Sequence, residues 1–448
     1  MKKSNSSFYG LVLPIRLLVS VLLGAVMFCF ILIKAPFGID LQSDVTATAA
    51  LFAILYFAVL AVFSLDEKAD GIFLLFTAAI LAALVYLRVS MLGNPSSDYR
   101  NFLSVWIEQM QNLSIKEALT EKIGDYNMPY LYFLLFVSGS KISSLVLIKW
   151  LSCVFDFVLA YFVMKCVELK VENKLVCYLS FILTASLPTV FINSAYWAQC
   201  DSILAALCIM SVYFALKENG IGATVCFALA FSVKLQAVFI LPVFIICFIV
   251  KKIKFWHAAL FPATFFATLL PAMLAGRSFI DCVKIYFDQA DQYPNLTLNA
   301  PSIWQIFGNF NFEYFQSVGI MLAGAAVLIL IYICFKFKDN ISSPLLLEAF
   351  YISALMIPLL LPRMHERYFY IADILSVLVF FYDRKRWYIP VVTVFASLNA
   401  YFAFLANKTT VSQPVVALAL VVILVLSVKN FAERITTENE SSREAVKS

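Results

Sequence analysis

Apolar runs recur from one end of the chain to the other, and short polar breaks separate them. Most runs hold about 15 to 25 residues, close to the length that a helix needs to cross the hydrocarbon core of a bilayer. They show no alternation of period two, so they exclude a transmembrane barrel. The pattern predicts an all-α polytopic membrane protein with about 11 to 14 transmembrane helices. The predicted spans are residues 11–34, 45–65, 71–92, 144–166, 175–194, 202–216, 221–235, 237–250, 256–275, 314–335, 342–361, 369–382, 387–406 and 411–428.

The composition strengthens this prediction. Of the 448 residues, 62% are hydrophobic and 14% are charged, and the mean hydropathy is +0.89. A soluble protein carries about 25% charged residues, so an ordinary soluble domain is excluded. The ten cysteines show no metal-ligand spacing, and we expect them to be small buried apolar residues. The first apolar run is too long for a signal peptide, and no small-residue cleavage site follows it.

The basic residues give the orientation of the spans. Counted alternately from a cytoplasmic N-terminus, the basic clusters all fall in cytoplasmic loops, as the positive-inside rule requires. We therefore expect a multi-pass protein of the cell membrane with both termini in the cytoplasm. A single transmembrane domain is predicted at 1–428 and a cytoplasmic tail at 429–448. The charged residues from 432 onward are expected to be disordered.

Two long segments, 93–143 and 276–313, are then predicted to be extracytoplasmic loops. In the first loop, Ser114 and Glu117 have the spacing of a capping box and predict a short helix that runs to Ile123. Such a helix would lie on the membrane surface. Its apolar contacts with the surface are expected from Leu113, Leu119 and Ile123. The loops should therefore contain short interfacial helices.

Unusual polar and aromatic residues gather at the predicted outer ends of the spans. A charged side chain at the centre of a bilayer costs about 3 kcal/mol or more, so it is rarely kept without a use. The cytoplasmic loops hold lysines and small turns and nothing comparable. We therefore expect a cavity that opens to the outer leaflet. The segments are residues 97–99, 124–129, 196–201, 234–236, 299–304 and 362–368.

The densest of these segments contains two arginines, a histidine and a glutamate. Arg363 and Arg367 share one helix face if the helix continues through them, and two guanidinium groups can hold a phosphate bidentately. We predict that Arg363, His365 and Arg367 bind the phosphate of a donor, with Lys234 as a further contact. The alternative is an interfacial cluster whose long side chains reach the membrane surface, with Glu366 paired to an arginine. Lys234 likewise has the alternative of a simple interfacial lysine.

Three aspartates near the outer ends are candidates for chemistry. Asp98, Asp125 and Asp201 each also have a structural interpretation, as a helix cap or a turn residue. For Asp201, a cap and a substrate contact are compatible. Asp156 and Glu348 lie inside predicted spans and away from the outer ends, so we expect them in structural pairs.

Carboxylates, cations and aromatic rings suit the transfer of a sugar from a lipid phosphate. The leaving phosphate needs no acid, and one carboxylate can take the proton of the acceptor hydroxyl. Cations then stabilise the charge that grows on the phosphate, and direct attack inverts the anomeric centre. Glycosidases need two carboxylates because their leaving group is an alcohol. Tyr126, Trp197, Tyr293 and Trp304 are candidates to stack on sugars, with anchoring in the core or at the interface as the alternative.

Five of the segments carry a family resemblance through their order and spacing. They are 196–203, Lys234-Leu235-Gln236 with Pro242, 299–304, 364–368 and Asp98-Tyr99. With them, the chain resembles the GT-C superfamily of polytopic glycosyltransferases, which use polyprenyl-phosphate sugars. More narrowly, it resembles bacterial relatives of the second mannosyltransferase of GPI-anchor synthesis. The resemblance covers about residues 90–380.

The resemblance implies that Asp98 is the catalytic aspartate and that donor phosphate is recognised near His365 and Arg367. It also implies a donor flipped to the outer leaflet and an inverting transfer without a metal. The chain departs from the family by two extra spans before the catalytic loop and by Asp-Tyr where Asp-x-Asp is found. Many relatives carry glycine at the position of Ala198.

We therefore expect an integral membrane enzyme that moves a mannose-like or glucose-like hexose from a polyprenyl-phosphate donor to an extracytoplasmic glycan or lipid-linked acceptor. Asp98 is the expected general base. Membrane lipids are expected partners and nucleic acid is not; no cofactor is expected, and a divalent metal is left open. The predicted substrate-binding residues are Asp125, Tyr126, Trp197, Gln199, Asp201, Gln236, Asn299, Trp304, Glu366 and Tyr368.

Other interpretations stay open. A polysaccharide polymerase or ligase with a lipid-diphosphate donor would also place arginines and a histidine outside, and the donor distinguishes it. A lipid or solute transporter also buries charges in a cavity, but it predicts inverted repeats and helices broken at the midplane. The chain shows no clear internal repeat. A scaffold without activity leaves the cluster at 363–367 unexplained.

Overall fold

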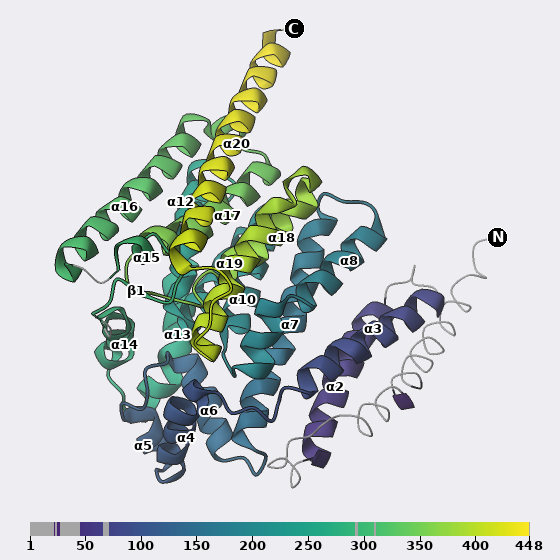
Figure 1. Ribbon diagram of the computed structural model, residues 1–448, viewed down its shortest axis with the longest axis vertical. Coiled ribbons are helices and arrows are strands. Elements are labelled where there is room, and N and C mark those ends of the chain that lie inside the picture. The colour runs from purple at the N-terminus through teal and green to yellow at the C-terminus, as the bar shows by residue number, and fades with distance from the viewer. Residues whose placement is uncertain are drawn as a thin grey trace. The chain divides into compact units, whose positions relative to one another are not determined.

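The computed structural model describes residues 22, 25–26, 45–65, 71–291, 294–308 and 311–447. Helices make up nearly all of its secondary structure (Figure 1), and the described strands are two residues long. These observations confirm the predicted all-α polytopic class. The predicted span at 11–34 falls outside the described residues except for residues 22, 25 and 26. Nine cysteines lie in the described ranges; all nine are buried, as predicted, and none of them forms a disulfide.

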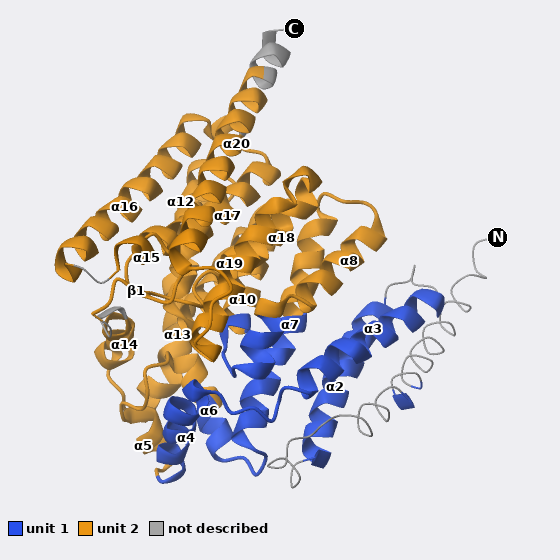
Figure 2. Cartoon of the chain, in the orientation of Figure 1, with its two compact units in different colours: residues 1–112, 134–157, 190–202 blue, residues 113–133, 158–189, 203–448 orange. Residues whose placement is uncertain are grey.

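Two compact units divide the chain, and each combines segments that are far apart in the sequence (Figure 2). Unit 1 comprises residues 1–112, 134–157 and 190–202, and unit 2 comprises residues 113–133, 158–189 and 203–448. The predicted site residues are divided between the units. Unit 1 contains Asp98, Trp197, Gln199 and Asp201, and unit 2 contains the others.

Unit 1 is a set of apolar helices, and several of their polar side chains find partners inside the unit. Its elements are α2 (Val45–Ser64), α3 (Gly71–Val89), the π-helix η2 (Tyr99–Leu103), α4 (Ser104–Gln111), parts of α6 (Met128–Ser138), α7 (Ser144–Glu168) and α9 (Pro188–Phe191), and the π-helix η3 (Ile192–Tyr196). The Tyr56 hydroxyl donates to the carbonyl of Ala78 over 3.1 Å. Trp150 Nε1 donates to the carbonyl of Leu51 over 2.9 Å. Such bonds are needed where lipid offers no partner.

Unit 2 is a helical bundle built around α17 (Ser343–Leu360), whose residues 345–359 are all buried. α17 packs against α16 (Phe312–Lys336), α18 (Tyr370–Tyr382) and α20 (Gln413–Lys447). The other elements are α5 (Ile115–Thr120), α8 (Lys174–Ala185), α10 (Asp201–Leu216), α11 (Gly220–Val233), η4 (Leu235–Ile240), α12 (Leu241–Ile249), η5 (Phe255–Ala259), α13 (Leu260–Ala275), α14 (Phe279–Asp291), β1 (Thr297–Leu298), α15 (Trp304–Phe307), η6 (Lys338–Asn340), β2 (Met364–His365), η7 (Arg384–Arg386) and α19 (Tyr388–Ala406).

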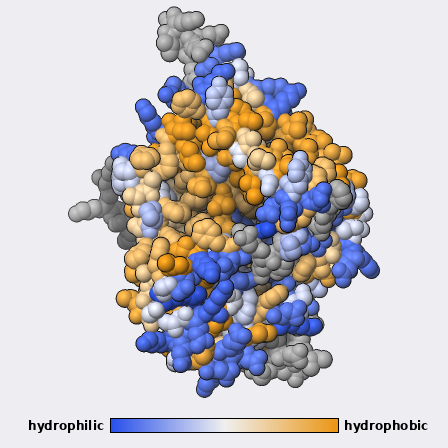
Figure 3. Space-filling model, turned by 90° about the vertical axis from the view of Figure 1, so that its left-hand side faces the viewer, coloured by the Kyte–Doolittle hydropathy of each residue, from blue (hydrophilic) through white to orange (hydrophobic). Residues whose placement is uncertain are grey.

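Eight helices of the described residues are long and apolar enough to cross a membrane, and nine if α8 with α9 and η3 forms one span. Figure 3 shows apolar residues gathered on one face of the molecule. On α16, apolar side chains such as Leu328 and Tyr332 are exposed. Outward apolar side chains on a long helix are what lipid requires. The membrane-protein prediction is therefore confirmed, and the sidedness of the loops stays a prediction.

Five further apolar helices have 10 to 17 residues. Four of them, α10, α11, η4 with α12, and α18, match predicted spans. The fifth, α6, was expected to be part of the outer loop at 93–143. Its apolar stretch is 11 residues long, which is shorter than a membrane span, so the search for span-length runs missed it.

α5 begins as predicted and ends earlier. Ser114 Oγ accepts from the N–H of Glu117, and the Glu117 carboxylate accepts from the N–H of Ser114, which confirms the capping box. These hydrogen bonds from Ser114 lower the pKa of Glu117. The helix ends at Thr120, and Ile123 is 4% exposed. The prediction that Ile123 rests on the membrane surface is therefore wrong, because this residue is buried in the protein.

The charged tail continues as helix instead of becoming disordered. α20 includes residues 432–447, so the expected disorder is wrong there. Ile435 is buried, and Arg434 pairs with Glu348 of α17, which also pairs with Arg386. These contacts dock the tail on α17 and confirm the structural pairing predicted for Glu348.

Candidate functional site

The predicted catalytic aspartate lies in unit 1, in the loop after α3. Asp98 Oδ2 accepts from Gln199 Nε2 over 2.6 Å and from Trp197 Nε1 over 3.1 Å. Gln199 and Trp197 are 2% and 0% exposed, whereas Asp98 is half-buried. Two buried donors thus orient the carboxylate of a half-buried residue. We call these three residues the Asp98 group.

Asp98 stands at the start of η2 and does not cap it. Its backbone is already helical, and its side chain makes no cap hydrogen bond. The N–H of Tyr99 donates to Ser96 Oγ over 3.2 Å instead. The capping alternative for Asp98 is therefore wrong, and its carboxylate serves the contacts with Trp197 and Gln199.

The loop that supplies Trp197 and Gln199 has a left-handed residue at its centre. Ala198 has φ 66°, between the end of η3 and the start of α10. A residue with a Cβ pays about 1 kcal/mol or more for this conformation, which glycine adopts freely. The structure thus gives a reason for glycine at this position. Ser96 Oγ donates to the carbonyl of Trp197 over 2.6 Å and ties the loop to the segment that carries Asp98.

Asp201 supports the same loop from its other end. It is the first residue of α10 and is 4% exposed. Its Oδ2 accepts from Asn193 Nδ2 over 2.8 Å, and Asn193 lies in η3. This buried contact joins the two helices that flank the loop. The substrate contact predicted for Asp201 stays a prediction.

The predicted phosphate site lies in unit 2, in residues 362–368 between α17 and α18. We call this segment the cationic turn. α17 ends at Leu360, and Leu361 is extended, as expected of a residue before proline. Arg363 then adopts a left-handed backbone with φ 63°. The helix does not continue, so the condition under which Arg363 and Arg367 would share a helix face is not met.

Main-chain hydrogen bonds hold the cationic turn against residues 296–299. The N–H of Arg363 donates to the carbonyl of Leu296 over 2.9 Å, and the N–H of Glu366 donates to that of Leu298 over 3.0 Å. Between these bonds β1 and β2 pair in parallel, and Asn299 forms a bridge with His365. Two segments that the sequence marked separately thus form one structure.

The side chains of the cationic turn gather around a buried carboxylate. Arg367 Nε lies 3.3 Å from Glu366 Oε1, and His365 Nδ1 lies 3.8 Å from Glu366 Oε2. Arg363 Nη2 donates to Gln316 Oε1 over 3.2 Å. The interfacial alternative expected the pairing of Glu366 with an arginine. However, the Arg367 side chain is only 14% exposed and its partner Glu366 only 2%, which is not the behaviour of an arginine that reaches for the membrane surface.

Trp304 anchors the cationic turn to the helices beside it. Its Nε1 donates to the carbonyl of Leu360 over 2.9 Å, and the residue is 2% exposed. A Cβ on Gly319 would lie 2.5 Å from Trp304 Cζ2 and 2.8 Å from Pro362 Cδ. Glycine at 319 therefore lets the indole and the first residue of the turn approach α16 closely. This burial favours the core alternative for Trp304 over stacking on a sugar.

Lys234 lies at a break between helices. α11 ends directly before it, Lys234 itself is extended, and the 3-10 helix η4 follows. Its ammonium lies 5.6 Å from the centroid of the Tyr126 ring, and the residue is 8% exposed. Gln236 Oε1 is buried, with no hydrogen-bond partner in the part of the chain that the structure describes. A buried lysine over an aromatic ring differs from a simple interfacial lysine.

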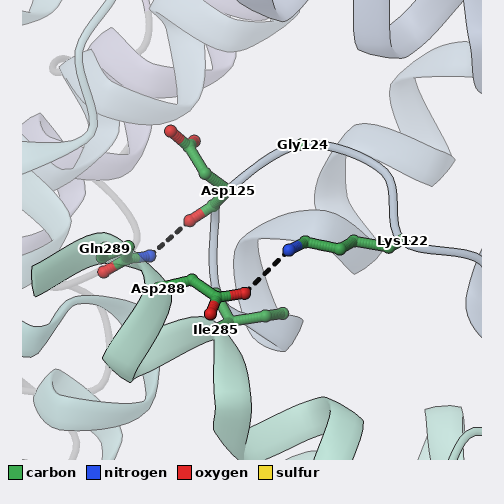
Figure 4. A pocket seen from close by; sticks show the side chains of 6 residues that line it. All are labelled: Lys122, Gly124, Asp125, Ile285, Asp288 and Gln289. Carbon is green, nitrogen blue, oxygen red and sulfur yellow. Dashed lines mark hydrogen bonds and ion pairs between the residues drawn. The ribbon is translucent and has the colours of Figure 1, made fainter. Parts of the chain in front are cut away.

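Asp125 lines a small pocket that belongs wholly to unit 2 (Figure 4). The pocket has a volume of about 200 Å³, and its lining residues are Lys122, Gly124, Asp125, Ile285, Asp288 and Gln289. The carbonyl of Asp125 accepts from Gln289, and its carboxylate points away from the pair of Lys122 and Asp288. Lys122 Nζ lies 2.7 Å from Asp288 Oδ2, and this hydrogen bond lowers the pKa of Asp288. Several polar groups thus line one small pocket.

The structure brings together some predicted residues and adds others. It joins Trp197 and Gln199 to Asp98, Asn299 to His365, and Lys234 to Tyr126. Tyr293 lies outside the described residues. In the described ranges, no three His, Cys, Asp or Glu side chains gather as metal ligands would. Sequence reasoning missed the supporting residues Ser96, Asn193, Ser194 and Gln316. For the first three the only signal was a polar side chain near a marked segment, and Gln316 lies beside none of the segments.

A comparison with protein families matches more than half of the chain. The family described as glycosyltransferase family 87 matches residues 126–362. The match includes the loop at 196–201 and the break at Lys234, and it stops directly before Arg363, while Asp98 precedes it. A search of curated proteins finds no match.

Proposed function

The chain belongs to glycosyltransferase family 87, and on this premise we propose an inverting transfer of a hexose from a polyprenyl-phosphate donor. The acceptor is an extracytoplasmic glycan or a lipid-linked molecule, and the hexose is mannose-like or glucose-like. Family membership supports glycosyl transfer, and the apolar helices support a location in the membrane, where a lipid-linked donor would be within reach. Asp98 is the general base.

The fixed orientation of the Asp98 carboxylate is the observation that carries the proposal. A general base has to lie within hydrogen-bond reach of the proton that it takes. Gln199 and Trp197 both donate to Oδ2, so they fix the plane of the carboxylate and the direction of its other oxygen. A carboxylate held in this way is suited to take the acceptor hydroxyl proton as the glycosidic bond forms. Direct attack by that hydroxyl inverts the anomeric centre.

The departing lipid phosphate is a stable anion, so it needs cations and no acid. We assign this role to Arg363, His365 and Arg367 of the cationic turn, with Lys234 as a further contact. A guanidinium presents a planar fork that matches phosphate oxygens. The buried Glu366 beside Arg367 and His365 keeps these two side chains in place before the donor arrives.

We place this reaction on the extracytoplasmic side, with both termini in the cytoplasm. The positive-inside distribution of lysine and arginine supports this orientation. The donor then has to be flipped to the outer leaflet before it reacts. The segments at 196–203 and 364–368 support the narrower relationship with bacterial relatives of the second mannosyltransferase of GPI-anchor synthesis.

A donor panel tests the proposal. Purified enzyme is incubated with extracted cell-envelope glycans and glycolipids and with a set of polyprenyl-phosphate hexoses. We expect one donor to release bare polyprenyl phosphate, with inversion at the transferred sugar. The corresponding polyprenyl-diphosphate sugars form the second arm, and a chelator is added to a third. Turnover of the diphosphate donors alone would identify a polymerase or ligase and contradict the proposal.

A further inference from the structure

A buried carboxylate in unit 1, that of Asp156, accepts hydrogen bonds from both ends of the loop that supplies Trp197 and Gln199. Asp156 lies in α7 and is 0% exposed. Its Oδ2 accepts from Ser194 Oγ over 2.6 Å, and its Oδ1 accepts from Ser202 Oγ over 2.5 Å. Ser194 lies in η3 and Ser202 lies in the first turn of α10. One side chain therefore contacts the residues that precede and follow the loop at 195–201.

Arg88 completes this arrangement. Its Nε donates to Asp156 Oδ2 over 2.8 Å, and both side chains are 0% exposed. A carboxylate buried in this way is stable only when it is paired and hydrogen-bonded. In this ion pair Asp156 accepts from Arg88 as well as from the two serines, and hydrogen bonds in which one partner is ionised are stronger than neutral ones. The two serines are thus held more firmly than an uncharged partner would hold them.

Both donors lie close along the chain to these two serines. Trp197 lies three residues after Ser194, and Gln199 lies three residues before Ser202. The N–H of Trp197 donates to the carbonyl of Ile192 over 2.8 Å, and that of Gln199 donates to the carbonyl of Asn193 over 3.0 Å. The loop is therefore short and closed on itself, so movement of either end moves both donors of the Asp98 group.

We propose that Asp156, paired with Arg88, is a positioning residue for the general base. Its carboxylate accepts from Ser194 and Ser202, and we call these two hydrogen bonds the clasp. Through the clasp it fixes the positions of the two donors that orient Asp98. This inference rests on the role of Asp98 proposed above. Asp156 does not touch the reacting atoms, and its effect passes through Trp197 and Gln199. The rival interpretation is a structural ion pair that stabilises unit 1 without affecting the base.

Serine variants test the clasp, because Asp156→Asn would leave Arg88 buried beside an uncharged partner and endanger folding. Ser194→Ala and Ser202→Ala each remove one hydroxyl and keep the ion pair. We expect each to lower kcat about 10-fold, since small misplacements of catalytic groups are costly. The KM values for donor and acceptor should stay within about twofold of wild type, because neither substrate is contacted. Where an alanine variant does not fold, the cysteine variant of the same position gives the same comparison.

Ser211→Ala is the matched control. Ser211 lies in α10, is buried, and donates to the carbonyl of Ala223 over 2.7 Å, outside the clasp. Its loss also removes a buried hydroxyl bond from α10, so it reports the effect of such a loss on stability. We expect its kcat to match wild type, and a fall equal to that of Ser202→Ala would overturn the proposal.

A double-mutant cycle separates positioning from mere structure. The background is the variant with Trp197→Phe and Gln199→Ala, which keeps Asp98 and lacks both donors. In this background, Ser194→Ala or Ser202→Ala should not lower kcat any further. A loss as large as in wild type would overturn the proposal, because the serines would then not act through the donors. If Asp98→Asn were inactive while the serine variants kept the kcat of wild type, the role proposed for Asp156 would be wrong and the role proposed for Asp98 would stand. If Asp98→Asn were fully active, the proposed base itself would fail.

Discussion

Side chains hold Asp98, whereas the main chain holds the cationic turn. In unit 1, the buried residues Gln199 and Trp197 donate directly to the carboxylate. In unit 2, the N–H groups of Arg363 and Glu366 bind the carbonyls of residues 296–298. The basic side chains of the cationic turn remain half-buried.

This difference follows from what each region has to present. A base acts through one oxygen, so its supporting side chains have to fix it closely. A phosphate has several acceptor oxygens, and a charge acts over a longer distance than a single hydrogen bond. Long cationic side chains on a fixed backbone therefore suffice for phosphate. Side-chain changes near Asp98 should lower the rate, and backbone changes near the cationic turn should lower stability.

The largest expected effect is the loss of the base. Asp98→Asn should lower kcat about 10²–10⁴-fold, the usual contribution of a general base. The asparagine oxygen can still accept from Gln199 and Trp197, so the thermal unfolding midpoint should match wild type. Asp281→Asn is the control, because Asp281 is an exposed residue of α14 whose carboxylate accepts from Ser278, and it should retain the rate. If Asp98→Asn retained activity, the base would have to be Asp125 or Asp201.

The next effect tests the close packing of α16 against Trp304 and the first residue of the cationic turn. Gly319→Ala should destabilise the protein by about 1–3 kcal/mol, because the new Cβ overlaps the Trp304 ring and Pro362. The measurement is the unfolding midpoint in detergent. Gly324 lies on the same helix, and a Cβ added there would meet nothing within 4 Å, so Gly324→Ala is the matched control. Similar destabilisation by both variants would show that α16 tolerates alanine poorly in general, and the close packing on Trp304 would not matter.

The smallest expected effect concerns a single cationic side chain. Arg367→Ala should raise the donor KM about 10-fold, which corresponds to about 1.4 kcal/mol, and leave the acceptor KM unchanged. Arg367→Lys keeps the charge without the planar fork and should fall between alanine and wild type. The measurement is steady-state kinetics with each substrate varied in turn. An equal rise of both KM values would argue against phosphate recognition by this residue.

The helices could be predicted from the sequence because their causes are local. Apolar runs of span length became helices, and the capping box at Ser114 formed as its spacing predicted. The charged tail was misjudged because its order depends on a distant partner. Arg434 pairs with Glu348, which is 86 residues away, and composition carries no information about that contact.

The candidate site could be predicted only in pieces. Asp98, Trp197 and Gln199 were each marked by their place at the end of an apolar run, but their contacts join residues 99 and 101 positions apart. The helix break before Arg363 was within reach of sequence reasoning, since a residue that precedes proline favours extended backbone. The serines around Asp156 were not, because a serine in an apolar run has many possible partners.

The pair of Arg88 and Asp156 also constrains the order of events during synthesis. Arg88 leaves the ribosome 68 residues before Asp156, which takes roughly 3 to 14 seconds at typical rates of translation. During that interval the arginine, in the last turn of its helix, has to extend its side chain toward water. Only when α7 arrives in the bilayer does the guanidinium gain its counter-charge. We therefore expect the third apolar segment of the nascent chain to settle into its final depth only after a later segment has been inserted.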